Sequence, residues 1–181
     1  MPITKVTGEV STTNYYSPFT GDNSNILLLK AKANLNSNLN VSFGVGNMFT
    51  LEDGKSKDVP AIEAKASYDI GKYLNTQLRF RELGGTEQYK LSFGAKYKAD
   101  KQNIFDLMTY LSAKDSKEWS FNTGLQASYT HKFKNGISIS AEIEQGIPLG
   151  KDAPSIGKTL GSFNDSKKKI NLGIAIPIGK N

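Results

Sequence analysis

The chain has 181 residues, of which 38% are hydrophobic and 22% charged. Its longest apolar run, residues 26–29, is far shorter than the ~20 residues that a membrane-spanning helix needs. The absence of cysteine and the single histidine, His131, exclude thiol catalysis, disulfides and the usual metal clusters. Lys and Arg number 23 against 17 Asp and Glu, giving a net charge of +6 without a concentrated basic tail. We therefore expect one domain over residues 1–181 with no enzymatic activity, metal or cofactor.

An alternation of apolar and polar residues, typical of half-buried strands, recurs along the whole chain. It runs through residues 6–12, 27–35, 39–49, 62–70, 75–81 and 89–97, and again through 119–129, 137–143 and 170–176. Residues 104–113 fit either a strand or a helix, because their apolar positions satisfy both periods. With that segment as a strand, the chain predicts about ten strands.

The connections between these segments alternate in length. Residues 14–25, 50–60 and 150–168 make long connections, whereas 36–38, 71–73 and 134–136 make tight ones, the last with an Asn-Gly turn. In an up-and-down sheet, successive connections lie at opposite ends. We therefore expect the long loops at one end, and the tight turns with both termini at the other.

The alternation alone allows two orientations of the faces. A soluble barrel would enclose its apolar face, whereas a membrane barrel would turn that face to lipid and enclose the polar one. Three features favour the membrane orientation. Aromatic residues of the apolar face gather near strand ends, alanine and threonine are common on that face, and glycine lies mostly on the polar face.

In this alternation, in its aromatic rims and in its loop lengths, the sequence resembles the small bacterial outer-membrane β-barrels. The resemblance implies an all-β fold, an antiparallel up-and-down barrel of about ten strands of the transmembrane type with a polar lumen. It implies a narrow pore or a membrane scaffold with long loops at one end. Residues 1–6 lack the apolar segment of a secretory signal, so we expect either a processed chain in the outer membrane or a cytoplasmic or virion protein.

Ten charged residues are predicted to line the lumen, and six aromatic residues to form lipid-facing rims. Enclosed charges must pair or be hydrated, so the lumen is either a mutually neutralised plug or, through its excess of cations, an anion-favouring pore; a solvated outer face is the third interpretation. The lumen set is Lys30, Lys32, Glu63, Lys65, Arg79, Arg81, Lys90, Lys96, Glu142 and Glu144. The rim set is Phe49, Tyr68, Tyr89, Tyr97, Trp119 and Tyr129.

The expected partners are membrane lipid or detergent and a surface partner that contacts the long loops. Nucleic acid is not expected, because rings and lysines fall on opposite faces of the strands. His131 has no carboxylate placed beside it by the sequence, which argues against a hydrolase. Two other functions stay open: a soluble all-β structural subunit of a virion or other assembly, and a soluble barrel that carries an apolar ligand. The sequence does not determine the oligomeric state.

Overall fold

The computed structural model describes residues 5–16, 23–52, 55–115, 118–149 and 168–178, and these residues form ten strands and no helix. The strands are β1 (Lys5–Tyr16), β2 (Asn23–Asn34), β3 (Leu39–Glu52), β4 (Lys55–Ile70), β5 (Leu74–Leu83), β6 (Thr86–Lys98), β7 (Asn103–Asp115), β8 (Trp119–Lys132), β9 (Ser138–Pro148) and β10 (Lys168–Ile178). No helix in the described part of the chain is long and apolar enough to cross a membrane.

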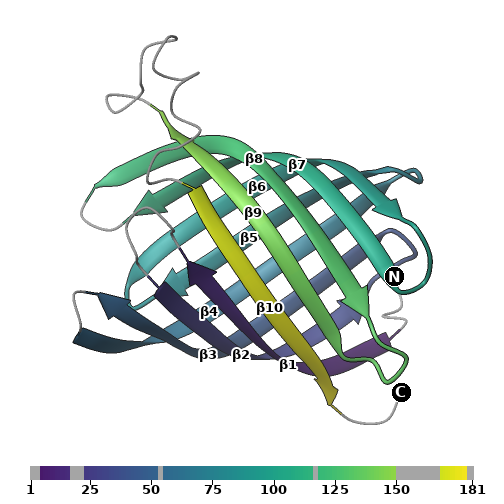
Figure 1. The fold of residues 1–181 in the computed structure, drawn as a ribbon, viewed down its shortest axis with the longest axis horizontal. Helices are drawn as coiled ribbons and strands as arrows, with labels where there is room; N and C mark the ends of the chain where they lie inside the picture. Colours follow the sequence, from purple (N-terminus) through teal and green to yellow (C-terminus); the bar gives the residue numbers. More distant parts are fainter. Residues whose placement is uncertain (1–4, 17–22, 53–54, 116–117, 150–167, 179–181) are drawn as a thin grey trace.

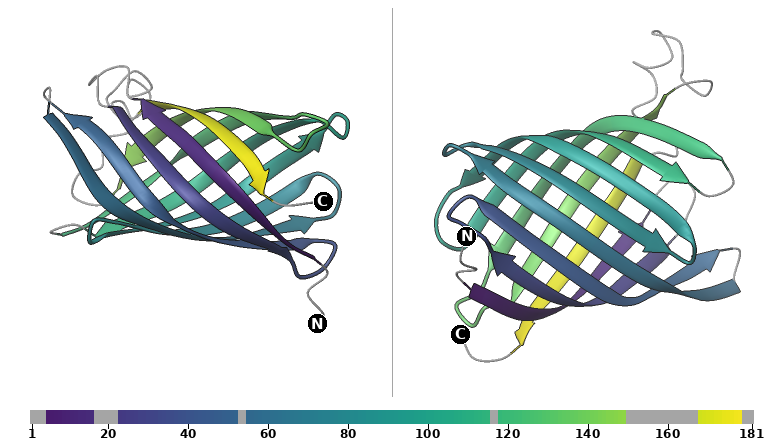
Figure 2. Two further views of the ribbon diagram at one scale, coloured as in Figure 1. Left: turned by 90° about the horizontal axis from the view of Figure 1, so that it is seen from below. Right: turned by 180° about the vertical axis from the view of Figure 1, so that it is seen from behind.

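Every strand pairs antiparallel with its neighbour in the sequence, and β1 pairs with β10 to close the barrel (Figure 1). The closing pair runs from Gly8 opposite Ile178 to Tyr16 opposite Ile170. The strands cross the barrel obliquely, as the views from below and behind show (Figure 2). This is the all-β, antiparallel up-and-down barrel that the alternation predicts.

The two ends of the barrel differ in their connections. We call the end at which β1 begins and β10 ends the proximal end, and the opposite end the distal end. At the proximal end, Asn36 accepts hydrogen bonds from the backbone amides of Asn38 and Leu39, at 2.8 Å each. Asp100 makes a similar turn before β7, and hydrogen bonds from the Asn103 side chain and nearby backbone amides hold its pKa below the usual value.

Two sequence expectations about local structure are now settled. Residues 104–113 are strand, as part of β7, so the helical alternative is wrong. Residues 50–60 are not a long loop, because β3 and β4 stay paired as far as Glu52 opposite Lys55. The backbone hydrogen bonds between β3 and β4 continue beyond the residues in which apolar and polar side chains alternate. The predicted long connection at 150–168 lies outside the described residues, apart from Lys168.

The two faces of the sheet differ sharply in character. On β6, Lys90 and Ser92 are 7% and 3% exposed, whereas Leu91 and Phe93 between them are 50% and 47% exposed. The same alternation leaves aliphatic and aromatic side chains exposed all around the outer face. The apolar residues therefore point outward, and the polar ones are enclosed.

One apolar cluster departs from this pattern. Ile26, Leu28 and Ala61 are buried on the inner face, and three partly buried residues pack against them: Tyr15, Met48 and Leu83. The polar lumen predicted from the sequence thus contains an apolar patch on β2 and β4. It lies toward the distal end, where it narrows the interior.

We expect Leu91→Arg to lower the free energy of unfolding in lipid bilayers by ~2–4 kcal/mol, because it places a charge in the middle of the outer face. Tyr73→Arg, in the exposed proximal turn between β4 and β5, should cost no more than ~1 kcal/mol. Denaturant titration of both variants in vesicles measures the difference. Equal losses would contradict a lipid-facing outer surface.

Candidate functional site

The enclosed face of the barrel contains two polar cavities. The entrance cavity has a volume of about 560 Å³ and lies toward the distal end. Tyr15 and Ile26 line one of its walls, and Glu144 lines another. The central cavity, about 210 Å³, lies deeper and is lined by Lys65, Asp106 and Glu142 among others. Arg79 and Lys90 line both cavities, so these two side chains stand where the two spaces meet.

Glu63 is the centre of a buried ion cluster beside the apolar patch. Its Oε1 lies 3.2 Å from the Nζ of Lys30, and its Oε2 accepts a hydrogen bond of 2.6 Å from the Nε of Arg81. The other arm of the Arg81 guanidinium donates to the hydroxyl of Tyr15, and the guanidinium lies 5.1 Å from the centre of that ring. Four strands, β1, β2, β4 and β5, are thereby tied together inside the barrel.

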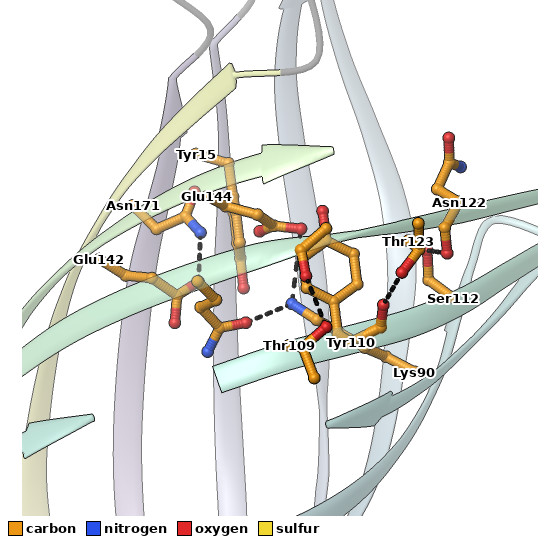
Figure 3. A network of polar contacts seen from close by, with 12 residues as sticks. Tyr15, Lys90, Thr109, Tyr110, Ser112, Asn122, Thr123, Glu142, Glu144 and Asn171 are labelled. Carbon is orange, nitrogen blue, oxygen red and sulfur yellow. Dashed lines mark hydrogen bonds and ion pairs between the residues drawn. The ribbon is translucent and has the colours of Figure 1, made fainter. Parts of the chain in front are cut away.

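A second cluster surrounds Lys90 on the opposite side (Figure 3). Its Nζ lies 3.4 Å from the Oε1 of Glu144, donates to the Oε1 of Gln126 at 2.6 Å, and lies 4.3 Å from the centre of the Tyr110 ring. Gly124 makes room for that ring, since a Cβ at residue 124 would lie 2.8 Å from the Tyr110 Cζ. This cluster links β6 to β7, β8 and β9 across the lumen.

Lys65 and Arg79 have no such partners. Neither forms a salt bridge or a side-chain hydrogen bond with any described residue, although both lie on the inner face and are only partly exposed. They sit directly opposite each other on β4 and β5, and Arg79 in turn sits opposite Lys90 on β6. Three cations therefore occupy adjacent positions along one wall.

The proximal half of the lumen is held by weaker contacts around one buried amide. Asn75, which is fully buried, donates to Ser67 Oγ at 3.0 Å and to Asp69 Oδ1 at 2.7 Å, and accepts from Gln77 at 2.9 Å. The same Asp69 oxygen lies 3.9 Å from the Nζ of Lys96. These contacts fill the interior near the proximal turns with polar side chains.

All ten charged residues predicted for the lumen lie on the inner face, but their environments differ. Glu63, Arg81 and Lys90 are buried, and Lys32, paired with Glu9 at 3.1 Å, is half exposed. Glu142 accepts a hydrogen bond of 2.7 Å from Asn171 on the neighbouring strand. The remaining five, Lys30, Lys65, Arg79, Lys96 and Glu144, are partly exposed to the interior.

The six predicted rim residues lie on the outer face in two groups. Tyr89 and Trp119 lie toward the distal end with ring centres 6.0 Å apart, and Phe49 shares that end on β3. Tyr68, Tyr97 and Tyr129 lie toward the proximal end, where Tyr129 packs on Phe105 at 4.9 Å. Their assignment as lipid-facing rims stays a proposal.

The residues of the site that are absent from the predicted lumen set include Tyr15, Asn75, Tyr110 and Asn171. The alternation of side chains along the strands could have identified the last three. Each of them points to the same face of the sheet as the charged residues of its own strand or of the neighbouring strand. Tyr15 was assigned to a loop, whereas β1 continues through Tyr16. Its contact with Arg81 joins residues 66 positions apart, which no local pattern reveals.

The described residues hold no group of three or more His, Cys, Asp or Glu side chains that could bind a metal ion. His131 lies at the proximal end, where its Nδ1 is 2.9 Å from the Oδ1 of Asn103 and its ring packs on Phe133. The expected absence of metal and cofactor is not tested by these contacts.

The sequence matches no protein-family model and no curated protein. Among solved structures, the fold is similar to an outer membrane channel from Pseudomonas putida F1, with a TM-score of 0.54, 9% identity, and coverage of 98% of this chain and 97% of the channel. The NanC porin aligns with a TM-score of 0.42 and 14% identity over 94% of this chain and 100% of the porin. In fold, therefore, the chain resembles this Pseudomonas outer membrane channel.

We expect Glu63→Gln to lower the free energy of unfolding by ~3–5 kcal/mol, because it leaves the Lys30 and Arg81 charges enclosed without a counterion. Glu9→Gln is the matched control: its partner Lys32 is half exposed, so the loss should not exceed ~1 kcal/mol. Denaturant titration of the refolded proteins measures both. Similar losses in the two variants would show that the Glu63 cluster does not stabilise the barrel.

Proposed function

We propose that this chain inserts in an outer membrane and forms a narrow, polar pore without enzymatic activity. The observation that carries the proposal is the pair of polar cavities enclosed by a sheet whose outer face is apolar. In a lipid bilayer, a strand can satisfy its backbone only in a closed sheet. The similarity to the Pseudomonas channel supports the fold on which this proposal rests.

The outer face supports the membrane location. Leu91, Leu125 and Ile143 are 50%, 51% and 57% exposed near the middle of their strands, and a soluble protein rarely exposes so wide an apolar belt. Aromatic rings flank this belt toward both ends, as at the two interfaces of a bilayer. We therefore propose lipid or detergent as the direct partner of this surface.

The interior supports a conducting role over the two soluble alternatives. A carrier of an apolar ligand needs an apolar interior, whereas this lumen encloses Glu63, Arg81 and Lys90. A soluble assembly subunit would place these charges in solvent instead. The ion clusters hold their side chains in place, and the two cavities that share Arg79 and Lys90 are the proposed path for solutes.

The scaffold role and the surface partner have less support. Both were predicted from long connections, and of these residues 50–52 and 55–60 are strand, while 17–22, 53–54 and 150–167 lie outside the described residues. We therefore propose the pore as the function and leave the loop partner as a prediction from the sequence.

The purified protein should need detergent, and in a planar bilayer it should produce discrete conductance steps. Tyr110→Ala should raise the conductance, because the ring is buried inside the lumen against Lys90. Tyr97→Ala removes an equal ring from the outer face, where it is 54% exposed, and should leave the conductance unchanged. A protein that is monodisperse in buffer, or a bilayer that stays silent, would refute the pore.

A further inference from the structure

Lys65, Arg79 and Lys90 form a row of cations inside the barrel, and two of them, Lys65 and Arg79, form no salt bridge with any described residue. The three residues occupy successive register positions on β4, β5 and β6. Directly opposed residues on neighbouring strands have Cβ atoms about 5 Å apart, and like charges at that distance repel. A sheet that keeps three cations in this arrangement gains nothing in stability from it.

The carboxylates of the lumen do not neutralise this row. Both oxygens of Glu63 are already engaged, one by Lys30 and the other by Arg81. Glu144 forms a salt bridge with Lys90 and also interacts with Tyr110 and Lys169, and no described carboxylate lies within salt-bridge distance of Lys65 or Arg79. Two of the three cations thus face the lumen without a direct salt bridge, although Glu63, Glu142 and Glu144 lie near enough to attract them.

The space beside the row has the size and the donors for a small anion. The central cavity of about 210 Å³ is bordered by all three cations and by the hydroxyl groups of Ser92, Ser128 and Ser140. Glu142 and Asp106 also border it. Glu142 accepts a hydrogen bond from Asn171, and Asp106 accepts one from Ser128. A neutral donor therefore already stabilises part of the charge of each carboxylate.

We infer that Lys65, Arg79 and Lys90 form a binding site for a compact oxyanion, a carboxylate or phosphate group, at the junction of the two cavities. The guanidinium of Arg79 supplies a planar pair of donors suited to two oxygens of one anion, and the two ammonium groups supply point charges on either side. This inference rests on the proposed pore function. An anion that crosses the lumen must pass the residues that line both cavities, and these include Arg79 and Lys90. It is a wall site rather than a plug.

Binding can be measured without conductance, by the unfolding midpoint of the detergent-solubilised protein in potassium phosphate against potassium chloride at equal ionic strength. A ligand that binds only the folded state raises the midpoint. We expect phosphate to raise it for the wild type, and Arg79→Gln and Lys65→Gln to weaken phosphate binding about tenfold or more. Arg79→Lys should retain part of the effect, and Glu142→Gln should strengthen it.

Lys32→Gln is the matched control, because it removes an equal charge from the inner face near the proximal end and outside the row. It should leave the phosphate effect unchanged. The inference is overturned if the wild type shows no rise in phosphate, or if Arg79→Gln and Lys65→Gln both keep the full rise.

A measurement of ion selectivity then distinguishes a failure of the anion-site inference from a failure of the pore proposal. In a gradient of potassium chloride, the wild type should favour chloride, and Arg79→Gln should reduce the chloride-to-potassium permeability ratio several-fold while Lys32→Gln does not. A silent bilayer with an Arg79-dependent phosphate effect would refute the pore and support the site. Conductance that is equally selective in the wild type and Arg79→Gln, with no phosphate effect, would support the pore and overturn the site.

Discussion

The structure depends on the closing contact between the first and last described strands. In hydrocarbon, an unpaired backbone amide or carbonyl costs several kcal/mol, so an open sheet edge is not viable there. The antiparallel pairing of β1 with β10 removes both edges at once. Closure also determines the two faces: one parity of every strand must point into the enclosed space, and the other must point outward.

Closure creates the second constraint, which is electrostatic. Charges that point inward lose part of their hydration, and they are tolerated only when other groups replace the water. The barrel meets this demand unevenly. Around Glu63 and Lys90, the interactions reach across several strands and tie opposite walls together. Lys65 and Arg79 form no salt bridge with any described residue, and both side chains line the central cavity.

This division gives a physical basis on which one lumen could combine stability with the proposed pore function. The neutralised clusters and the apolar patch at Ile26 and Leu28 narrow the interior and hold its side chains in place. Arg79, which forms no salt bridge with any described residue, lies where the two cavities meet, and Lys65 lines the central cavity. If every charge in the lumen were paired, the interior would be filled more completely and would act as a plug. If the paired clusters were absent, the enclosed charges would destabilise the folded barrel more strongly.

The sequence by itself determined the strand class, the approximate number of strands and the parity of the charged residues, because a period of two is a local property of side-chain direction. The sequence did not decide whether residues 104–113 form a strand or a helix, because their apolar positions suit both. It also predicted a loop at 50–60, where the alternation of apolar residues fades but the pairing of β3 with β4 continues. Only the tertiary structure decided which charges meet. Arg81 reaches Tyr15 and Lys90 reaches Glu144 across the enclosed space, and such contacts follow from closure and register, which couple residues far apart in the chain.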